Sequence, residues 1–261
     1  MSTLVCFHAH PDDEAIATAG LMMGAVDAGH RVVLVVATRG EGGLVPDDLA
    51  AGESLGDRRT AEQERAAEML GVHRLEWLEY GDSGMAGEAT NDDPGCFWQA
   101  DVDDAAGRLA ALLEDEAIDV LTIYDDHGGY DHPDHIAIHR VGTRFAEMRG
   151  VANVYWATMN RDLITKQMET MRDATANMPD DDPGINPQSF GMAEADITHR
   201  VDARPYIDRK RAAMVAHASQ ITEDTFFLQI PPPVFEAVFG DEWFHAPGKT
   251  RDDDFIEGLF N

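Results

Sequence analysis

An alternation of strand-like and helix-like segments along the first 160 residues constrains the fold of this chain most strongly. Residues 31–38 (RVVLVVAT) form a continuous β-branched run, which is typical of a strand covered on both faces. Similar apolar runs, interleaved with segments of helical spacing, occupy residues 3–9, 73–81, 119–125 and 153–159. This alternation predicts an α/β fold with a mostly parallel sheet flanked by helices.

The length of the chain favours one large domain. With 261 residues it is long enough for a full α/β domain with a packed core. We expect residues 1–160 to form the α/β core and residues 161–261 to form a lid and a C-terminal cap. Residues 179–187 (PDDDPGINP) are rich in proline and aspartate and predict a surface loop or lid.

The charge of the chain excludes several classes of partner. Its 49 acidic and 20 basic residues give a net charge of −29, which opposes binding to nucleic acids and to anionic membranes. No apolar window approaches the roughly 18 residues that a membrane span requires. The two cysteines lie far apart, and the N-terminus lacks the pattern of a signal peptide, so we expect a cytoplasmic protein. The sequence leaves open whether copies of the chain form a homo-oligomer.

Two motifs rich in histidine and aspartate follow predicted strands. Residues 10–14 (HPDDE) come directly after the first apolar run, and residues 132–135 (HPDH) follow the run at 119–125. Each motif opens a segment with helical spacing. Ligands of open α/β sheets bind beyond the carboxyl ends of the strands, so we expect the two motifs to meet in one pocket.

The residue types in these motifs favour a metal site. A catalytic zinc commonly takes three histidine and carboxylate ligands and leaves one position open, whereas a thiolate site would need a cysteine cluster that this sequence lacks. We predict that His10, Asp13 and His135 hold one Zn²⁺ per chain, and the sequence leaves open whether Fe²⁺ fills the site instead. For each aspartate considered singly, the alternative is a helix N-cap.

The other motif residues predict metal-assisted hydrolysis. A metal lowers the pKa of bound water to about 7, so a neighbouring carboxylate can accept its proton, and Asp12 is the candidate general base. His132 is the candidate general acid. We expect Asp134 to hydrogen-bond His132 and to favour its imidazolium form, which would stabilise an oxyanion or protonate a leaving amine.

These motifs resemble those of the LmbE-like (PIG-L) family of zinc-dependent N-deacetylases, whose two hallmark segments are A-H-P-D-D-E and H-P-D-H. Residues 9–14 and 132–135 match them. Residues 82–85 (DSGM) and 128–130 (GGY) are similar to the actinobacterial branch that includes the N-acetylglucosaminyl-inositol deacetylase and the mycothiol S-conjugate amidase. The resemblance implies a Rossmann-like fold and the same metal ligands and base as assigned above.

The resemblance also implies roles for three further residues. Arg59 would bind a substrate oxygen or phosphate, Asp82 would contact a sugar hydroxyl, and Tyr130 would help to hold the oxyanion. Local alternatives stay open, because Arg59 could pair with a glutamate of its own helix and Asp82 could cap a turn. His217, in AHASQ, either reaches the site from the C-terminal part or packs as a structural residue.

The leading hypothesis is a zinc-dependent hydrolase acting on an amide C–N bond. It would remove an N-acyl group, with acetyl as the first expectation, from a small molecule that contains an amino sugar, and release a free amine and a carboxylate. One alternative keeps this chemistry but makes the chain an amidase of mycothiol-type thiol S-conjugates. Another, of a different class, is a non-catalytic metabolite-binding protein with a relic metal site. The intact motif residues favour the enzyme.

Overall fold

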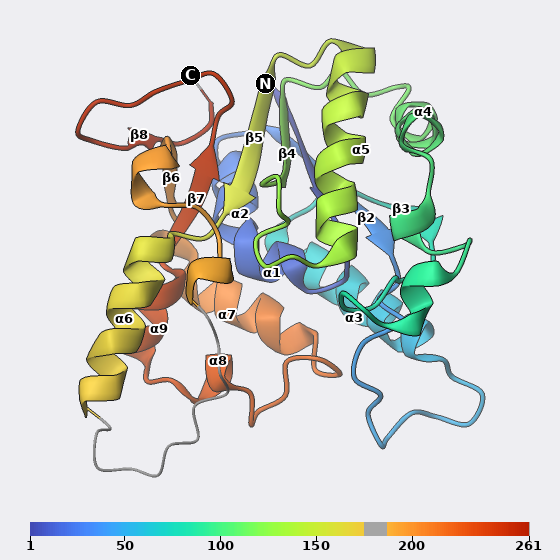
Figure 1. Ribbon diagram of the computed structural model, residues 1–261, viewed down its shortest axis with the longest axis horizontal. Helices are drawn as coiled ribbons and strands as arrows, with labels where there is room; N and C mark the ends of the chain where they lie inside the picture. Colours follow the sequence, from blue (N-terminus) through green and yellow to red (C-terminus); the bar gives the residue numbers. More distant parts are fainter. Residues whose placement is uncertain (175–186, 261) are drawn as a thin grey trace.

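The computed structural model describes residues 1–174 and 187–260, and one eight-stranded sheet runs through this part of the chain (Figure 1). The strand order is β3-β2-β1-β4-β5-β7-β6-β8. The strands are β1 (Thr3–His8), β2 (Arg31–Thr38), β3 (Arg74–Tyr80), β4 (Val120–Tyr124), β5 (Asn153–Thr158), β6 (His199–Asp202), β7 (Asp241–His245) and β8 (Ile256–Glu257). The strands β3, β2, β1, β4 and β5 are parallel, which confirms the predicted α/β fold class.

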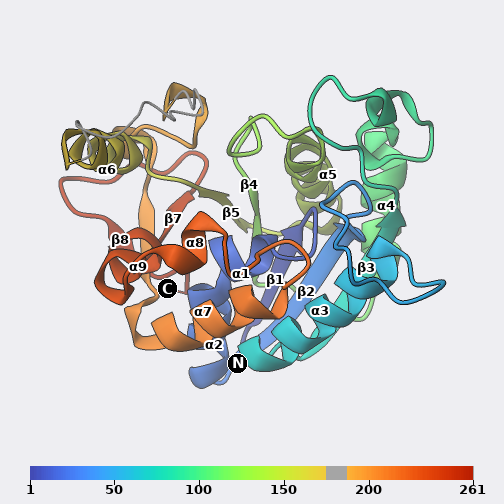
Figure 2. The same cartoon turned by 90° about the horizontal axis from the view of Figure 1, so that it is seen from below.

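Helices cover both faces of the sheet. They are α1 (Asp13–Ala17), α2 (Ala19–Asp27), α3 (Leu55–Leu70), α4 (Val102–Leu112), α5 (Pro133–Arg149), α6 (Arg161–Ala174), α7 (Ile207–Ala216), α8 (Phe226–Gln229) and α9 (Pro232–Phe239). Helix α3 packs against α7 on one face, together with α1 and α2, while α4 packs against α5 on the opposite face (Figure 2). The parallel strands are therefore enclosed, as their apolar sequences require.

The sequence explains the rigidity of this frame. The side chains of residues 32–37 in β2 are completely buried, so this strand contributes to the core through both faces. Helix α3 begins with a capping box, in which Ser54 accepts the N–H of Asp57 and Asp57 accepts the N–H of Ser54. The helix ends at Gly71, whose φ of 78° suits glycine. Well-defined elements thus hold the loops at the carboxyl ends of the strands.

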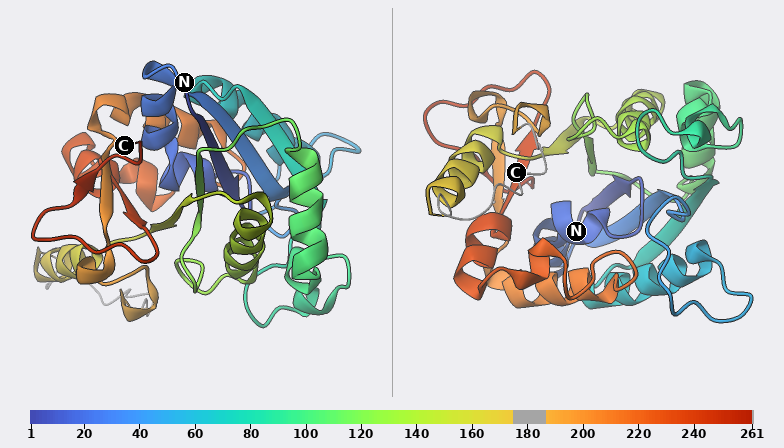
Figure 3. Two further views of the ribbon diagram at one scale, coloured as in Figure 1. Left: turned by 90° about the horizontal axis from the view of Figure 1, so that it is seen from above. Right: turned by 60° about the horizontal axis from the view of Figure 1, so that its bottom comes forward.

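The C-terminal part contributes more to the sheet than the sequence predicted. Instead of forming only a lid and a cap, it adds β7 antiparallel to β5, then β6 antiparallel to β7, and β8 parallel to β6 (Figure 3). Helix α7 from the same part packs against α3, α1 and α2. The proposed division at residue 160 stays a prediction. Most of the predicted loop at 179–187 lies outside the described residues.

A buried ion pair within the C-terminal part includes a carboxylate that also binds the core. The Nζ of Lys210 on α7 lies 2.7 Å from Oε1 of Glu242 on β7, and each side chain is only 1% exposed. The Glu242 carboxylate also accepts the N–H groups of Gly20 (2.7 Å) and Leu21 (2.8 Å). These two groups belong to the first turn of α2, so Glu242 caps that helix from a strand more than 200 residues away in sequence.

Two further expectations concern membranes and cysteines. Among residues 1–174 and 187–260, the structure contains no helix with the length and apolar character needed to cross a membrane. Cys6 and Cys96 are both free and buried. Burial raises the pKa of the Cys6 thiol to about 12, so this side chain is an inert part of the core.

Candidate metal centre

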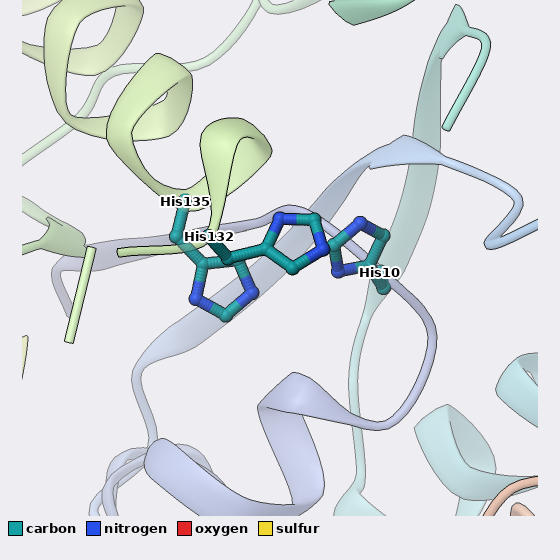
Figure 4. A group of neighbouring side chains, drawn as sticks. All are labelled: His10, His132 and His135. Carbon is teal, nitrogen blue, oxygen red and sulfur yellow. The ribbon is translucent and has the colours of Figure 1, made fainter. Parts of the chain in front are cut away.

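The two histidine-rich motifs meet at the carboxyl ends of neighbouring strands. Strand β1 pairs in parallel with β4, so the segments that follow them leave the sheet side by side. His10 lies on the loop after β1, whereas His132 and His135 lie at the start of α5, and the three rings face one another (Figure 4). Their ring nitrogens lie within 4.8 Å of one another, and all three residues are buried. The two motifs therefore lie close together, as the sequence predicted.

The Asp13 carboxylate lies between two of these rings. Its Oδ2 is 3.5 Å from Nδ1 of His10 and 3.4 Å from Nε2 of His135. The backbone N–H of His10 donates to the same oxygen at 2.9 Å and fixes its position. Ligands around a tetrahedral zinc stand about 3.3 Å apart, given Zn–N and Zn–O distances of about 2.0–2.1 Å. The distances from Asp13 to the two imidazoles are therefore close to those between zinc ligands, and the assignment of the three ligands stays a prediction.

Hydrogen bonds turn the two rings toward this position. Nε2 of His10 bonds Oδ2 of Asp134 at 3.1 Å, and Nδ1 of His135 bonds the carbonyl of Gly128 at 3.1 Å. The His135 ring also stacks on Tyr124, with centroids 4.3 Å apart. In each ring one nitrogen is held by an acceptor, and the nitrogen that is left faces Asp13. Metal-ligating histidines are commonly fixed by hydrogen bonds of this kind.

His132 differs from the other two histidines. Its Nδ1 accepts the backbone N–H of Asp134 at 3.1 Å, so the imidazole caps the N-terminus of α5. A ring nitrogen that accepts a hydrogen bond carries no proton, which places the proton of the neutral ring on Nε2. Burial, together with His10 and His135, lowers the pKa of His132 to about 3. His132 is therefore less suited as a ligand than Asp13, although its ring lies close enough.

The expected hydrogen bond between the Asp134 side chain and His132 is wrong. Asp134 lies on the first turn of α5, where its backbone N–H, and not its carboxylate, bonds His132. That carboxylate contacts His10 and the N–H and hydroxyl of Ser83. Asp134 thus supports the orientation of His10 and gives no hydrogen bond that would favour an imidazolium at His132.

Asp12 occupies an unusual backbone conformation beside the candidate ligands. Its φ is 114°, a region that non-glycine residues rarely adopt. Its N–H donates to Oε2 of Glu14 at 3.0 Å, and its own Oδ2 accepts from Nη2 of Arg59 at 3.2 Å. Burial raises the pKa of Asp12 to about 6, although Arg59 acts in the opposite direction. The side chain keeps 18% of its surface exposed, so it can meet water.

Arg59 joins two loops that border the site. The side chain is buried and donates to the carbonyl of Gly40 at 2.8 Å and to that of Pro11 at 2.5 Å, in addition to Asp12. Pairing with a glutamate of its own helix is not what the structure shows, because Glu62 instead bonds Ser219. The resemblance-based contact between Arg59 and substrate stays a prediction.

Asp82 and Tyr130 also lie at the site. Oδ1 of Asp82 is 3.7 Å from Nε2 of His10, and the carboxylate accepts the N–H groups of Gly84 (2.8 Å) and Gly42 (3.1 Å), so it also closes a turn. The hydroxyl of Tyr130 lies 3.5 Å from Nε2 of His135, and the residue is 36% exposed. The contacts of both residues with substrate stay predictions.

Three contributions to the site were missed from the sequence. Ser83 holds Asp134, Tyr124 stacks on His135, and Glu14 connects the site to the C-terminal part. Nε2 of His217 lies 2.8 Å from Oε1 of Glu14, so His217 reaches the site indirectly. The sequence signal for Ser83 and Tyr124 was their place near strand ends, three residues after β3 and at the end of β4.

A family model and two curated relatives place the chain in the same family. Residues 5–146 match the sequence model of the PIG-L family, described as GlcNAc-PI de-N-acetylase. A 1D-myo-inositol 2-acetamido-2-deoxy-alpha-D-glucopyranoside deacetylase from Thermobifida fusca is 36% identical and covers 97% of this chain and 96% of its own length. A protein of the same name from Acidothermus cellulolyticus is 37% identical, with 98% of this chain and 95% of its own length covered.

Solved structures share the fold at lower identity. The N,N'-diacetylchitobiose deacetylase from Pyrococcus horikoshii has a TM-score of 0.61 at 21% identity, covering 94% of this chain and 83% of its own. The conserved protein TT1542 from Thermus thermophilus has a TM-score of 0.59 at 19% identity, covering 98% of this chain and 99% of its own. At these identities the likeness shows the fold alone.

Proposed function

The chain belongs to the PIG-L family, and on that premise we propose that it is a metal-dependent N-deacetylase. It hydrolyses the N-acyl amide, in the first place an N-acetyl group, of a small molecule that contains an amino sugar. The products are a free amine and a carboxylate. One observation carries this proposal, namely that Oδ2 of Asp13 lies 3.5 Å from Nδ1 of His10 and 3.4 Å from Nε2 of His135.

His10, Asp13 and His135 fit a zinc ion. Two imidazoles and one carboxylate are a common catalytic zinc set, and the hydrogen bonds of each ring leave the nitrogen near Asp13 available. When bound, the cation would acidify a water molecule and polarise the amide carbonyl. The competing set of His10, His132 and His135 is less suitable, because Nδ1 of His132 already accepts a backbone N–H.

Asp12 is the proposed general base. It precedes Asp13 in the chain, and its carboxylate is partly exposed, so water can reach it. Arg59 holds Oδ2 of Asp12 in place, while Arg59 itself is fixed by two backbone carbonyls. The task of Asp12 is to accept a proton from the attacking water, which requires a carboxylate in a fixed orientation.

His132 is proposed to act through Nε2. Because Nδ1 accepts the N–H of Asp134, the Nε2–H group is the one that can donate a hydrogen bond. A neutral donor at this position would stabilise the negative charge that develops on the amide oxygen. The Tyr130 hydroxyl, which lies 3.5 Å from Nε2 of His135, is proposed as a second donor to the same oxygen. Asp134 supports His10 in this scheme.

The relatives' printed names support an amino-sugar substrate. Both are named as deacetylases of an inositol-linked 2-acetamido sugar, and we propose an N-acetylglucosaminide of this kind as the substrate. Arg59 and Asp82 are the proposed contacts to the sugar. The free thiols of Cys6 and Cys96 support a reducing compartment such as the cytoplasm.

Metal removal tests the proposed reaction. The protein is treated with a strong chelator, and release of amine from an N-acetylglucosaminyl-inositol is measured before and after addition of Zn²⁺ or Fe²⁺. We expect chelation to abolish amine release and one of the metals to restore it. Asp12→Asn should bind the metal but lose at least about 100-fold in kcat. Activity that survives both metal removal and Asp12→Asn would disprove the scheme, and a mycothiol S-conjugate offered in parallel tests the amidase alternative.

A further inference from the structure

We propose that Ser83 is a positioning residue that sets how tightly the site holds its metal, by fixing Asp134 against His10. This inference rests on the proposed function only in taking His10 as a metal ligand. Ser83 follows β3, a strand that supplies none of the three candidate ligands. It would thus connect a third strand end to the metal centre.

The contacts of Ser83 with Asp134 are direct and completely buried. The Ser83 hydroxyl donates to Oδ1 of Asp134, and the Ser83 backbone N–H donates to Oδ2 at 3.0 Å. Both residues have no exposed surface. Oδ2 of Asp134 in turn bonds Nε2 of His10 at 3.1 Å. Two donors from one residue therefore restrain the carboxylate that bonds the His10 ring.

The orientation of the Ser83 hydroxyl is itself fixed. The backbone N–H of Trp98 donates to Oγ of Ser83 at 2.9 Å, which leaves the hydroxyl proton for Asp134. The carbonyl of Ser83 accepts hydrogen bonds from the hydroxyl of Thr90 (2.7 Å) and from Nδ2 of Asn91 (2.6 Å). Ser83 is thus tied to the loop after β3 through its carbonyl and to Asp134 through its donors, and these two roles can be separated by mutation.

The physical consequence concerns the second nitrogen of His10. When Nε2–H is held by a fixed carboxylate, the ring is oriented and Nδ1 becomes a better electron donor to a cation. Removing the hydroxyl of Ser83 leaves Asp134 with the backbone N–H, so the carboxylate can rotate and the His10 ring loses part of its restraint. Loss of an outer hydrogen-bond partner typically weakens metal affinity by about 10- to 100-fold. Because the backbone donor remains, we expect about 10-fold for Ser83→Ala.

Metal binding without substrate provides the test. The affinity for Zn²⁺ is measured by competition with a chromophoric chelator, and the visible spectrum of the Co²⁺ protein reports on ligand geometry. Ser83→Ala should weaken Zn²⁺ binding about 10-fold and alter the Co²⁺ spectrum. Ser83→Thr, which keeps the hydroxyl, should have the Zn²⁺ affinity and the Co²⁺ spectrum of the wild type. Thr90→Val is the matched control, because it removes a bond to the Ser83 carbonyl and leaves the contacts with Asp134 intact.

A double-mutant cycle decides whether Ser83 acts through Asp134. Asp134→Asn should weaken Zn²⁺ binding, and adding Ser83→Ala to it should have little further effect. The inference is overturned if Ser83→Ala binds Zn²⁺ like the wild type, if Thr90→Val matches Ser83→Ala, or if the two effects in the cycle add. If Ser83→Ala does not fold, Ser83→Cys replaces it and should give an intermediate affinity. A wild-type protein that binds no metal would overturn the proposed function as well, whereas normal wild-type binding with an unaffected Ser83→Ala overturns this inference alone.

Discussion

The buried pair of Lys210 and Glu242 permits a prediction with a defined magnitude. Both side chains are 1% exposed, and Nζ lies 2.7 Å from Oε1. Glu242→Gln leaves the ammonium group of Lys210 buried without its counter-charge. Removing one partner of such a pair lowers the free energy of unfolding by about 3–5 kcal/mol, because the remaining charge is not compensated.

The opposite substitution, Lys210→Met, should cost less. Glu242 would keep the N–H donors of Gly20 and Leu21, and the N-terminus of α2 also favours a negative charge. Methionine has a similar volume and suits an apolar environment. We expect a loss of about 1–3 kcal/mol for Lys210→Met. With about 2–4 °C for each kcal/mol, Tm should fall by about 6–20 °C for Glu242→Gln and by about 2–12 °C for Lys210→Met.

Thermal unfolding followed by circular dichroism, together with urea titration, measures both losses. The exposed Lys249, whose Nζ lies 5.4 Å from the centre of the Tyr155 ring, provides the control. Lys249→Met should cost at most about 1 kcal/mol. The double variant of Lys210 and Glu242 should cost less than the sum of the single changes. The reasoning is refuted if Lys210→Met costs as much as Glu242→Gln, or if both match the control.

Three further predictions follow from close contacts and charges near the sheet. Gly128→Ala would place a Cβ 2.5 Å from that of His135, so it should lower the free energy of unfolding by more than about 2 kcal/mol in urea titration. Gly150→Ala is the control, because it has a similar φ but open space around it, and it should cost about 1 kcal/mol. Two arginines lower the pKa of Glu116, so its ion pairs stabilise the fold above about pH 4.5 and lose this effect as the pH falls through the lowered pKa. Glu116→Gln should therefore cost about 1–2 kcal/mol at pH 7, and a loss that does not shrink between pH 4.5 and pH 3 would contradict this. His217→Ala removes a buried partner of Glu14 and should lower kcat about 10-fold or more, while His217→Gln, which keeps a donor, should restore part of it in steady-state assays.

The sequence was informative where a local pattern determines the structure. The apolar run of β2 and the position of both histidine motifs after strands predicted a parallel sheet and a site at one of its edges, because parallel topology brings strand ends together. The prediction that His10, Asp13 and His135 hold the metal rests on the same reasoning and stays a prediction. The short strands β6, β7 and β8 could not be predicted from the sequence, because their mixed charged and aromatic residues show no alternation. Pairing with strands distant in sequence decides their conformation.

The directions in which individual side chains point could not be predicted from the sequence. Asp134 is two residues from His132, and proximity in sequence favoured a contact between their side chains. In the first turn of a helix, however, the backbone N–H of the second helical residue can meet the capping side chain, and here the Asp134 carboxylate contacts His10 and Ser83 instead. Its partner Ser83 lies 51 residues away and belongs to no local pattern that includes Asp134. Such contacts depend on how the loops pack.

The imidazole of His132 has two structural roles, one at the N-terminus of α5 and one beside the candidate metal ligands. His132 closes the first turn of α5 through Nδ1, and the same ring faces His10 and His135. Most substitutions of His132 would therefore both destabilise the first turn of α5 and change the activity. An alanine variant could not separate these two effects. Asparagine is among the best capping residues, so a His132→Asn protein would keep its helix and display the chemical loss by itself. This dual duty also narrows which residues natural variation could tolerate at the position.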